Sequence, residues 1–343
     1  MNYELFCFLP SQSLHPIIVL ITAALLDYLI GDPSSWPHPV RVMGWIISRF
    51  SQFFLKHLDN PQALRCAGIF LGMGLVTGSG IVGWLIVYSA SWLHPLLGIA
   101  FESTLVASCF AGRSLKTAAQ DVLQYLQVGD IAIARSTLSL YVGRDTQQLS
   151  ESEILRAVLE TVSENATDGV MAPLFYAIAG TLIPSIGAVP LAMAYKAAST
   201  LDSMVGYREA PYTDLGWFSA RLEDHLTWLP CRLTVMTLAL LSNKPQYVWQ
   251  VCRRDAIQDP SPNSGWSECA YAAVLGVQLG GTNWYRGVAK HKPLLGEAIY
   301  PLTQEKIYQA LQLTRYCFLL WLGVAIAFTY TNSVYLCDRL DPP

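Results

Sequence analysis

Four long stretches of the chain contain no Asp, Glu, Lys or Arg and consist mainly of apolar residues. A membrane helix needs roughly 20 mainly apolar residues to cross roughly 30 Å of hydrocarbon, so each stretch is long enough to span a bilayer. The pattern therefore predicts an all-α, polytopic integral membrane protein. The four stretches are 5–26, 66–101, 169–195 and 316–337.

Helix-breaking residues inside these stretches predict how many helices they form. The first span is expected over 14–31, and the last over 316–336 after a polar loop over 286–315. Residues 66–112 are too many for one helix, and Trp92-Leu93-His94-Pro95 divides them into a hairpin of about 66–90 and 96–112. With the remaining stretch, this pattern predicts about four to six helical spans.

The stretch 169–195 differs from the other three because it contains three prolines, Pro173, Pro184 and Pro190. Proline removes a helical hydrogen bond and clashes with the preceding turn. Irregular backbone at membrane depth is tolerated only where protein surrounds it. This span is therefore predicted to be broken or re-entrant.

Between the hairpin and that broken span, residues 113–168 return to soluble character, with 13 charged residues in 56. Apolar residues recur at helical spacing within it. We predict a polar, helical extramembrane segment inside a single membrane domain covering 1–343. The recurring positions are Leu115, Ala118, Ala119, Val122 and Leu126.

Basic residues suggest how the chain is oriented. They concentrate in 41–65, 113–156 and 244–315, which are predicted to be cytoplasmic loops of a multi-pass protein of the cell membrane. The N-terminal stretch has no Lys or Arg before its apolar run and no small-residue cleavage site. We therefore interpret it as a retained span and not as a cleaved signal peptide.

Composition excludes several classes of protein. Lys+Arg total 22 and Asp+Glu total 25, so charged residues are 14% of the chain and the net charge is −3. Disordered chains, coiled coils and basic nucleic-acid-binding proteins do not have this composition. The 8 cysteines form no CxxC pair or Cys/His cluster, which argues against a disulfide framework or a structural zinc site.

One motif matches GxGxxG, the fingerprint of dinucleotide binding, at residues 78–83. The match lies within an apolar run, whereas the fingerprint needs a strand before it and a helix after it. Gly68, Gly72, Gly74 and Gly78 also give overlapping GxxxG spacing, so close helix–helix packing is the preferred interpretation.

Polar clusters beside the apolar stretches are the candidate sites. Asp27 lies at the end of an apolar helix, where an unpaired carboxylate is costly. Asp32, His38 and Arg41 follow within one loop. A helix cap and prolines shaping the loop would explain Asp32 alone, so we predict that these four residues have catalytic roles.

A second cluster is an acidic row. Glu160, Glu164 and Asp168 have i, i+4, i+8 spacing and would share one helix face, with Asn165 beside them. Like charges so placed repel unless a cation lies between them. Mg²⁺ takes hard oxygen ligands, typically one or two carboxylates plus substrate phosphate. A solvated acidic face is the alternative, but the row adjoins an apolar stretch, so we predict a metal site.

Further clusters follow the proline-containing stretch. Lys196 could bind phosphate as a point charge, or could extend to lipid headgroups instead. A Pro/Asn/Ser/Gly loop explains the prolines and glycine after residue 253 but not the charged residues around them. We predict catalytic roles for Asp202, Asp255 and Glu268, and substrate or phosphate binding by Lys196, Arg253, Arg254, Asn263 and Asn165.

Four ordered blocks of the sequence resemble one family. They are Asp27 to Gly44, Ser163 to Pro173 (SENATDGVMAP), Tyr195 to Gly206 (YKAASTLDSMVG) and Arg253 to Glu268 (RRDAIQDPSPNSGWSE). Together they resemble the adenosylcobinamide-phosphate synthase family of cobalamin biosynthesis. The similarity extends from about 20 to 287, and the C-terminus carries little of it.

The resemblance implies a membrane-embedded ligase. The expected reaction joins adenosylcobyric acid to aminopropanol or its O-phosphate through an amide bond, using ATP and Mg²⁺. The implied partners are the corrinoid substrate, the amino alcohol phosphate, membrane lipid and other late cobalamin-pathway membrane enzymes, with no nucleic acid.

Two other classes fit parts of the pattern. A membrane prenyl- or lipid-diphosphate transferase would use an acidic row with Mg²⁺, but two aspartate-rich motifs are expected and only one row exists. A small-molecule transporter would use the broken span as its substrate site. Repeated halves are expected in a transporter, and the sequence shows none.

Overall fold

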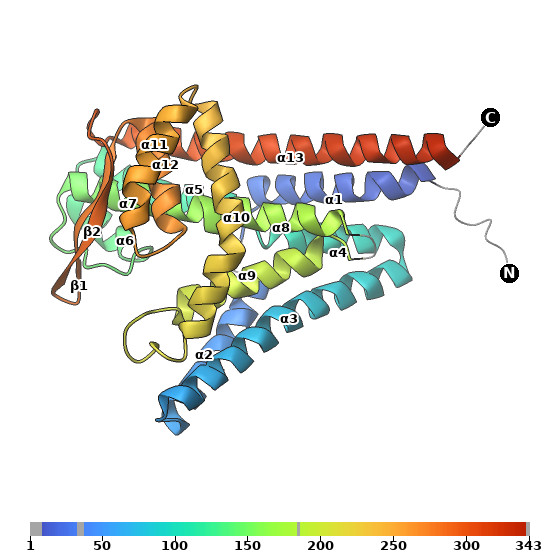
Figure 1. The fold of residues 1–343 in the computed structure, drawn as a ribbon, viewed down its shortest axis with the longest axis horizontal. Coiled ribbons are helices and arrows are strands. Elements are labelled where there is room, and N and C mark those ends of the chain that lie inside the picture. The colour runs from blue at the N-terminus through green and yellow to red at the C-terminus, as the bar shows by residue number, and fades with distance from the viewer. Residues whose placement is uncertain (1–8, 33–37, 184–185, 341–343) are drawn as a thin grey trace. The chain divides into compact units, whose positions relative to one another are not determined.

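The computed structural model describes residues 9–32, 38–183 and 186–340, most of which are helical (Figure 1). The prediction of an all-α membrane protein is confirmed, and the proposed number of crossings, four to six, stays a prediction. A shorter apolar helix covers Leu14–Leu29. Within the described part of the chain, three helical segments are long and apolar enough to cross a membrane: Pro61–Leu93, Pro95–Gln127 and Gln304–Asn332.

The chain divides into two compact units, and the prediction of a single membrane domain over 1–343 stays a prediction. The first consists of Met1–Ala111, Pro173–Glu223 and Leu319–Pro343, and the second of Gly112–Ala172 and Asp224–Phe318. The segment 113–168, predicted to be extramembrane, therefore belongs to the second unit.

The first unit is a set of packed helices. In it, α3 packs against α9 and α4, α1 packs against α4, and α2 packs against α9. Its helices are α1 (Leu9–Leu29), α2 (Pro39–His57), α3 (Pro61–Leu93), α4 (Pro95–Ala107), α8 (Ala172–Thr181) and α9 (Ala188–Val205).

Three of these helices begin in the same way, with a side-chain cap followed by proline. His38, Asn60 and His94 each accept a hydrogen bond from a backbone N–H in the first turn of α2, α3 and α4. Proline suits the first helical position because the N–H it lacks would have no partner there. The predicted break at 92–95 is confirmed, since α3 ends at Leu93 and α4 begins at Pro95.

The predicted break in 169–195 is also present. A π-helical turn covers Ala166–Met171, and α8 and α9 follow as separate helices. Gly187 lies just before α9 with φ of +80°, a backbone conformation that favours glycine. Pro184 lies outside the described residues, as does the 33–37 part of the first polar cluster.

Only part of the glycine-packing prediction is confirmed. A Cβ at Gly68 would overlap the carbonyl oxygen of Leu215, and one at Gly72 would lie 2.6 Å from the ring of Phe218. Gly74 has no atom within 4 Å of its Cβ position, and the same is true of Gly78. Close approach therefore requires the first two glycines only.

This contrast predicts different effects of one substitution on α3. We expect Gly68→Ala to lower the free energy of unfolding by about 1–3 kcal/mol, because the added methyl group meets rigid backbone. Gly74→Ala should be neutral or slightly stabilising, because alanine favours helix and the space is open. Thermal unfolding of the detergent-solubilised variants would measure both, and equal midpoints would contradict the packing assigned to Gly68.

The second unit combines helices with one hairpin. On α5 (Gly112–Gln127), the predicted apolar positions Leu115, Ala119, Val122 and Leu126 are buried. The other elements are α6 (Ile131–Leu138), α7 (Glu151–Asn165), α11 (Pro245–Asp255), α12 (Ser264–Leu275), β1 (Gln278–Tyr285) and β2 (Val288–Gly296). Two further helices, α10 (Trp217–Leu241) and α13 (Gln304–Leu340), contribute residues to both units.

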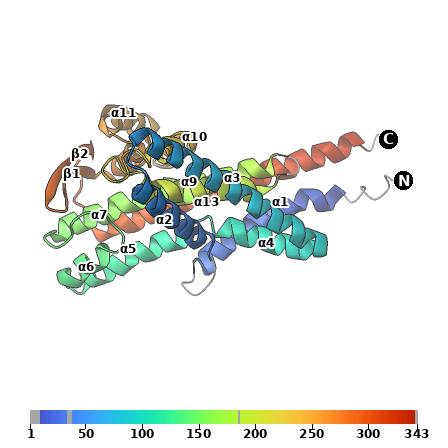
Figure 2. The ribbon, with the colours of Figure 1, turned by 90° about the horizontal axis from the view of Figure 1, so that it is seen from below.

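The β-hairpin corrects the expectation of a polar loop over 286–315 (Figure 2). Tyr285 pairs with Val288, so the loop has two residues, Arg286 and Gly287, with φ of 52° and 76°. Positive φ at both positions matches the twist of antiparallel strands. Asp145 accepts hydrogen bonds from both loop N–H groups, at 3.0 and 2.8 Å, and stabilises the turn.

Candidate functional site

A buried glutamate on α7 connects this helix to the β-hairpin. Glu160 is 2% exposed, and its Oε2 lies 2.6 Å from Nη2 of Arg144. Its Oε1 accepts a hydrogen bond of 2.9 Å from the N–H of Gly280 and lies 3.7 Å from Arg156. Arg156 also donates to the carbonyl oxygens of Gly280 and Thr282. Both oxygens of Glu160 are therefore occupied by structural contacts.

A bulge in β1 makes these contacts possible. The strand register shifts between Leu279 and Gly281, and Gly280 has φ of +85°. A Cβ at Gly280 would overlap the carbonyl oxygen of Pro293, so the position requires glycine. The bulge turns both backbone polar groups of Gly280 toward α7.

Strand β2 carries a lysine into a group of carboxylates. Nζ of Lys292 donates to Oε1 of Glu268 on α12 at 2.5 Å and lies 3.8 Å from Oδ2 of Asp259. The Glu268 side chain is fully buried and that of Asp259 is 4% exposed. Glu164, half-buried on α7, interacts electrostatically with Lys292 and Glu268. We call these four residues the Lys292 cluster.

The loop between α11 and α12 is held by its own hydrogen bonds. Oδ1 of Asp259 accepts from the N–H of Ser261 at 2.9 Å. Nδ2 of Asn263 donates to the carbonyl oxygen of Asp224 at 2.8 Å, and Arg232 donates to the carbonyl oxygen of the residue before Asn263. The loop therefore presents its side chains from a fixed backbone.

Hydroxyl groups join α7 to α12 next to the cluster. Oγ of Ser267 donates to the carbonyl oxygen of Ser163 at 2.6 Å and lies 2.7 Å from Oγ1 of Thr167. All three residues are buried. Glu164 follows Ser163 on α7, and Glu268 follows Ser267 on α12. The junction therefore places the turn of α7 that carries Glu164 next to the turn of α12 that carries Glu268.

Burial dominates the electrostatics of the Lys292 cluster. Removal from water raises the pKa of the Glu268 carboxyl well above its ordinary value, because the neighbouring glutamates add to this effect and Lys292 offsets only part of it. Burial likewise raises the pKa of Glu164. Burial opposes the charge on Lys292, but the surrounding carboxylates outweigh it and raise the pKa of this lysine. The cluster therefore holds a charged lysine beside carboxyls that take up protons readily.

A second ion pair lies at the end of α11. Arg254 donates to Oδ1 and Oδ2 of Asp255 at 2.6 and 2.8 Å and to Oε1 of Glu297 at 2.7 Å. Asp255 also accepts from the N–H of Gly296 at 3.0 Å. Arg254 accordingly lowers the pKa of Asp255. The sequence predicted phosphate binding by Arg254 and catalysis by Asp255, and in the described structure this pair connects α11 to the end of β2. Arg253, in contrast, is exposed and forms no hydrogen bond or ion pair with described residues.

The three acidic residues predicted to bind metal do not all lie in one row on a regular helix. Glu160 and Glu164 lie on α7, but Asp168 lies in the π-helical turn, whose wider hydrogen-bonded ring changes the angular spacing. Asn165 is exposed and its Nδ2 donates to the carbonyl oxygen of Thr161. Among the described residues, no three His, Cys, Asp or Glu side chains form a group that could hold a metal ion. Metal binding by this row stays a prediction.

The other predicted residues lie in the first unit. Nε2 of His38 lies 2.9 Å from Oδ1 of Asp32, and Nδ1 of His38 caps α2. This pair is the part of the first cluster that the structure brings together through a described contact. Of the rest, Asp27 is buried, Lys196 and Asp202 are half-buried, and Arg41 is exposed.

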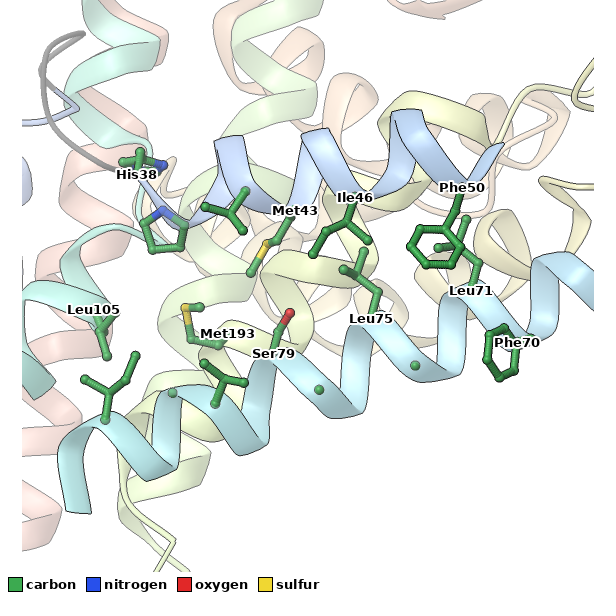
Figure 3. Close-up of a pocket in the computed structure, with 17 residues that line it drawn as sticks. His38, Met43, Ile46, Phe50, Phe70, Leu71, Leu75, Ser79, Leu105 and Met193 are labelled. Carbon is green, nitrogen blue, oxygen red and sulfur yellow. The ribbon is translucent and has the colours of Figure 1, made fainter. Parts of the chain in front are cut away.

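An apolar groove of about 530 Å³ lies beside α2 and α3 (Figure 3). Phe50 and Phe70 line one end and His38 lines the other. Gly74 contributes open space along α3, and Ser79 is the second lining residue with a polar side chain. This lining suits hydrocarbon and offers almost no partners for phosphate or carboxylate groups. The charged chemistry expected of the protein therefore belongs elsewhere.

Sequence reasoning missed several residues that the structure makes prominent. Lys292 lies in the stretch predicted to be a polar loop, and Asp259 lies in the Pro/Asn/Ser/Gly loop that follows residue 253. Arg144 and Arg156 lie in the polar segment without a motif around them. Glu102 on α4, in the first unit, accepts hydrogen bonds from the N–H of Ala188 and from His15. Most of these contacts have partners far away in the sequence, so no short-range pattern predicts them. The exception is Arg156 with Glu160, which are four residues apart on α7.

Comparison with known proteins gives one family. The family model described as "CobD/Cbib protein" matches residues 20–314. A cobalamin biosynthesis protein CobD from Synechocystis is 57% identical over 312 residues, covering 90% of this chain and 91% of the relative. No solved structure matches the chain.

More distant relatives have similar descriptions. A cobalamin biosynthesis protein CobD from Geobacter metallireducens is 43% identical over 83% of this chain and 87% of the relative. A cobalamin biosynthesis protein CbiB from Salmonella arizonae is 40% identical over 87% of this chain and 92% of the relative. The similarity includes both compact units and all of the candidate residues.

Proposed function

Because this chain belongs to the CobD/CbiB family and so acts in cobalamin biosynthesis, we propose that it is the ligase that completes an amide bond on the corrinoid. The substrates are adenosylcobyric acid and aminopropanol or its O-phosphate, with ATP as co-substrate. The product is adenosylcobinamide or its phosphate. The family match over most of the chain is the observation that carries this proposal. It favours neither the prenyl transferase nor the transporter.

The proposed reaction has two steps. The corrinoid carboxylate takes the terminal phosphoryl group of ATP, which forms an acyl phosphate and releases ADP. The amine nitrogen then forms the C–N bond while the C–O bond to phosphate breaks, and phosphate and one proton leave. The protein must position phosphate groups, accept the amine proton and stabilise developing charge.

The described residues supply groups for these tasks. Arg253 is an exposed cation at the end of α11, in one of the blocks that resemble the family. Removal from water raises the pKa values of the Glu164 and Glu268 carboxyls, so both take up a proton more readily than an exposed glutamate and suit proton transfer. We assign phosphate binding to Arg253 and proton transfer to the carboxyls of the Lys292 cluster, all of which lie in the second unit. Phosphate binding by Lys196, in the first unit, stays a separate prediction from the sequence.

Mg²⁺ is expected to arrive with ATP. The usual ligands of this ion are one or two protein carboxylates together with phosphate oxygens. The described carboxylates fit this arrangement better than a cage of three protein carboxylates. Glu164 is the member of the acidic row that forms no hydrogen bond or ion pair with a described residue, whereas Glu160 is engaged by arginines. When bound, the ion would neutralise charge on the phosphates, and metal binding by the acidic row stays a prediction from the sequence.

Purified protein in detergent tests the function directly. Adenosylcobyric acid, MgATP and either aminopropanol or aminopropanol O-phosphate should give the amide product, with one ADP and one phosphate released per amide. In cells lacking the protein, added cobinamide but not cobyric acid should restore growth. Absence of product with both amines would overturn the proposal. Fractionation with the cell membrane, as a multi-pass protein, is expected at the same time.

A pair of adjacent arginines tests the phosphate assignment. We expect Arg253→Met to raise the KM for ATP or aminopropanol phosphate by roughly ten- to hundredfold, each tenfold being about 1.4 kcal/mol. Arg254→Met is the matched control, because its guanidinium pairs with Asp255 and Glu297. The control should lower stability and leave both KM values unchanged. Unchanged KM values in the Arg253 variant would contradict the assignment.

A further inference from the structure

The apolar groove beside α2 and α3 is long and narrow (Figure 3). Along α3 its lining residues extend from Phe70 to Ile86, which is about 24 Å at about 1.5 Å per residue. Its volume of about 530 Å³ over that length gives a mean cross-section of about 22 Å². A helix about 10–12 Å wide needs roughly four times this area, whereas a hydrocarbon chain is only about 4 Å thick, the distance between carbon atoms in contact. A helix would therefore lie across the opening, and a hydrocarbon chain fits inside.

The lining of the groove gives a hydrocarbon chain apolar contacts along its length. Apart from His38 and Ser79, the lining side chains are apolar or belong to glycines. Gly74 and Gly78 leave space along α3, because no atom lies within 4 Å of the Cβ position of either residue. Since α3 is apolar and long enough to cross a membrane, the acyl chains of the bilayer are the hydrocarbon available to this groove.

Helix α2, which forms the other wall, has a basic stripe next to its groove face. Arg41, Arg49 and Lys56 are exposed and lie within about 80° of one another around the helix, at about 3.6 residues per turn. Trp45 lies on the same stripe and is 64% exposed. The helix contains no Asp or Glu, and Arg49 and Lys56 form no ion pair with a described residue. The neighbouring arc of the helix carries the groove residues Val42, Ile46 and Phe50.

Together these two features match the two parts of a phospholipid. Basic residues and tryptophan beside an apolar face are typical of a helix at the surface of a membrane that contains anionic lipid. We propose that α2 and α3 form a binding site for one anionic phospholipid, with an acyl chain in the groove and the phosphate on the basic stripe. The site lies within the first unit and does not depend on the ligase function.

Native mass spectrometry of the purified full-length protein tests the site, because it counts bound lipids and gives the oligomeric state in one measurement. Dioleoylphosphatidylglycerol and dioleoylphosphatidylcholine have the same chains, and only the first has a net charge. We expect the first phosphatidylglycerol molecule to bind with a Kd at least about fivefold below that of phosphatidylcholine, the usual contribution of one basic residue near an anionic surface. Glycerol 1-phosphate, a headgroup without chains, should not bind. Equal affinity for the two lipids would overturn the site.

Filling the groove tests where the chain lies. Gly78 is midway along the α3 wall, so Gly78→Leu puts a side chain into the space assigned to the acyl chain. We expect phosphatidylglycerol to bind this variant at least about tenfold more weakly, since displacing two methylene groups from an apolar surface costs about that factor. Gly323→Leu on α13 is the matched control, because Gly323 also has no atom within 4 Å of its Cβ position and does not line the groove. Equal binding by the two variants would contradict the placement.

A photoreactive lipid decides the placement if Gly78→Leu does not fold. Phosphatidylglycerol with a diazirine in its acyl chain is added to the unaltered protein, and the sites of attachment are mapped. Attachment concentrated on residues 70–86 would support the groove. Attachment spread equally over α3 and α13 would overturn it.

The charged part of the site is tested separately. Arg49→Gln should weaken phosphatidylglycerol binding by about fivefold and leave phosphatidylcholine binding unchanged. Lys116→Gln, an exposed position on α5 in the second unit, is the matched control and should change neither affinity. An Arg49 variant with the same preference for phosphatidylglycerol as the unaltered protein would remove the stripe from the site.

A second copy of the chain is the competing occupant, because Gly74 and Gly78 have the spacing of GxxxG packing. It predicts dimers of the unaltered protein, monomers of Gly78→Leu, and the same lipid binding by both. That result would overturn the lipid site and assign the groove to an interface between copies.

Discussion

Replacing Lys292 with methionine is expected to lower the free energy of unfolding by about 3–5 kcal/mol, because breaking a buried ion pair leaves an uncompensated charge. Nζ of Lys292 lies 2.5 Å from the fully buried Glu268 and 3.8 Å from Asp259. Without the ammonium group, Glu268 is tolerated only when protonated. The loss should therefore grow as pH rises, and chemical denaturation at several pH values would measure it.

Two further variants make this test specific. Adding Glu268→Gln to Lys292→Met should recover much of the lost stability, because the charge that lacked a partner is removed as well. Lys290→Met, an exposed position on the same strand two residues earlier, should change stability by no more than about 0.5 kcal/mol. Equal effects of the two single lysine substitutions would show that the buried pair contributes nothing.

The helical part of the fold could be predicted from the sequence because its signals are local. Charge-free stretches marked the long apolar helices, and prolines marked where α4 begins and where the 169–195 stretch breaks. Helical spacing on 113–168 placed Leu115 and Val122 inside the second unit. Each of these predictions depends on residues only a few positions apart, which is the range over which hydrophobic periodicity is informative.

The hairpin was missed because its local signals are weak. Its two-residue loop is Arg286-Gly287, in place of the Asn-Gly or Asp-Gly that usually indicates such a turn. The first five residues of β2 include three basic side chains and show no clear alternation of apolar and polar positions. Loop polarity therefore hid a strand that positions Lys292.

The candidate site was only partly predictable for a different reason. Glu268, Asn263 and Glu164 were named from composition and spacing, but their surroundings depend on long-range contacts. Glu160 was expected to bind metal, whereas in the structure it pairs with Arg144, which no motif connects to it. Spacing can place carboxylates on one helix face, but it does not show which of them already have a cation.

Glu160 and Glu164, one helical turn apart, should respond oppositely to the same substitution. We expect Glu160→Gln to lower the free energy of unfolding by about 3 kcal/mol, since the positive charge of Arg144 would stay buried without its carboxylate. This loss of stability is at the low end of the range for breaking a buried ion pair, because Arg144 keeps its hydrogen bond to Asn283. Glu164→Gln should leave stability nearly unchanged and reduce ligation, because burial already disfavours its charged form.

Limited trypsin digestion after Arg286, in the hairpin turn, reports detachment of the hairpin: cleavage should accelerate in the Glu160 variant and stay slow in the Glu164 variant. If the two variants were equally resistant and equally inactive, Glu160 would act in the chemistry and not in holding α7 to the hairpin.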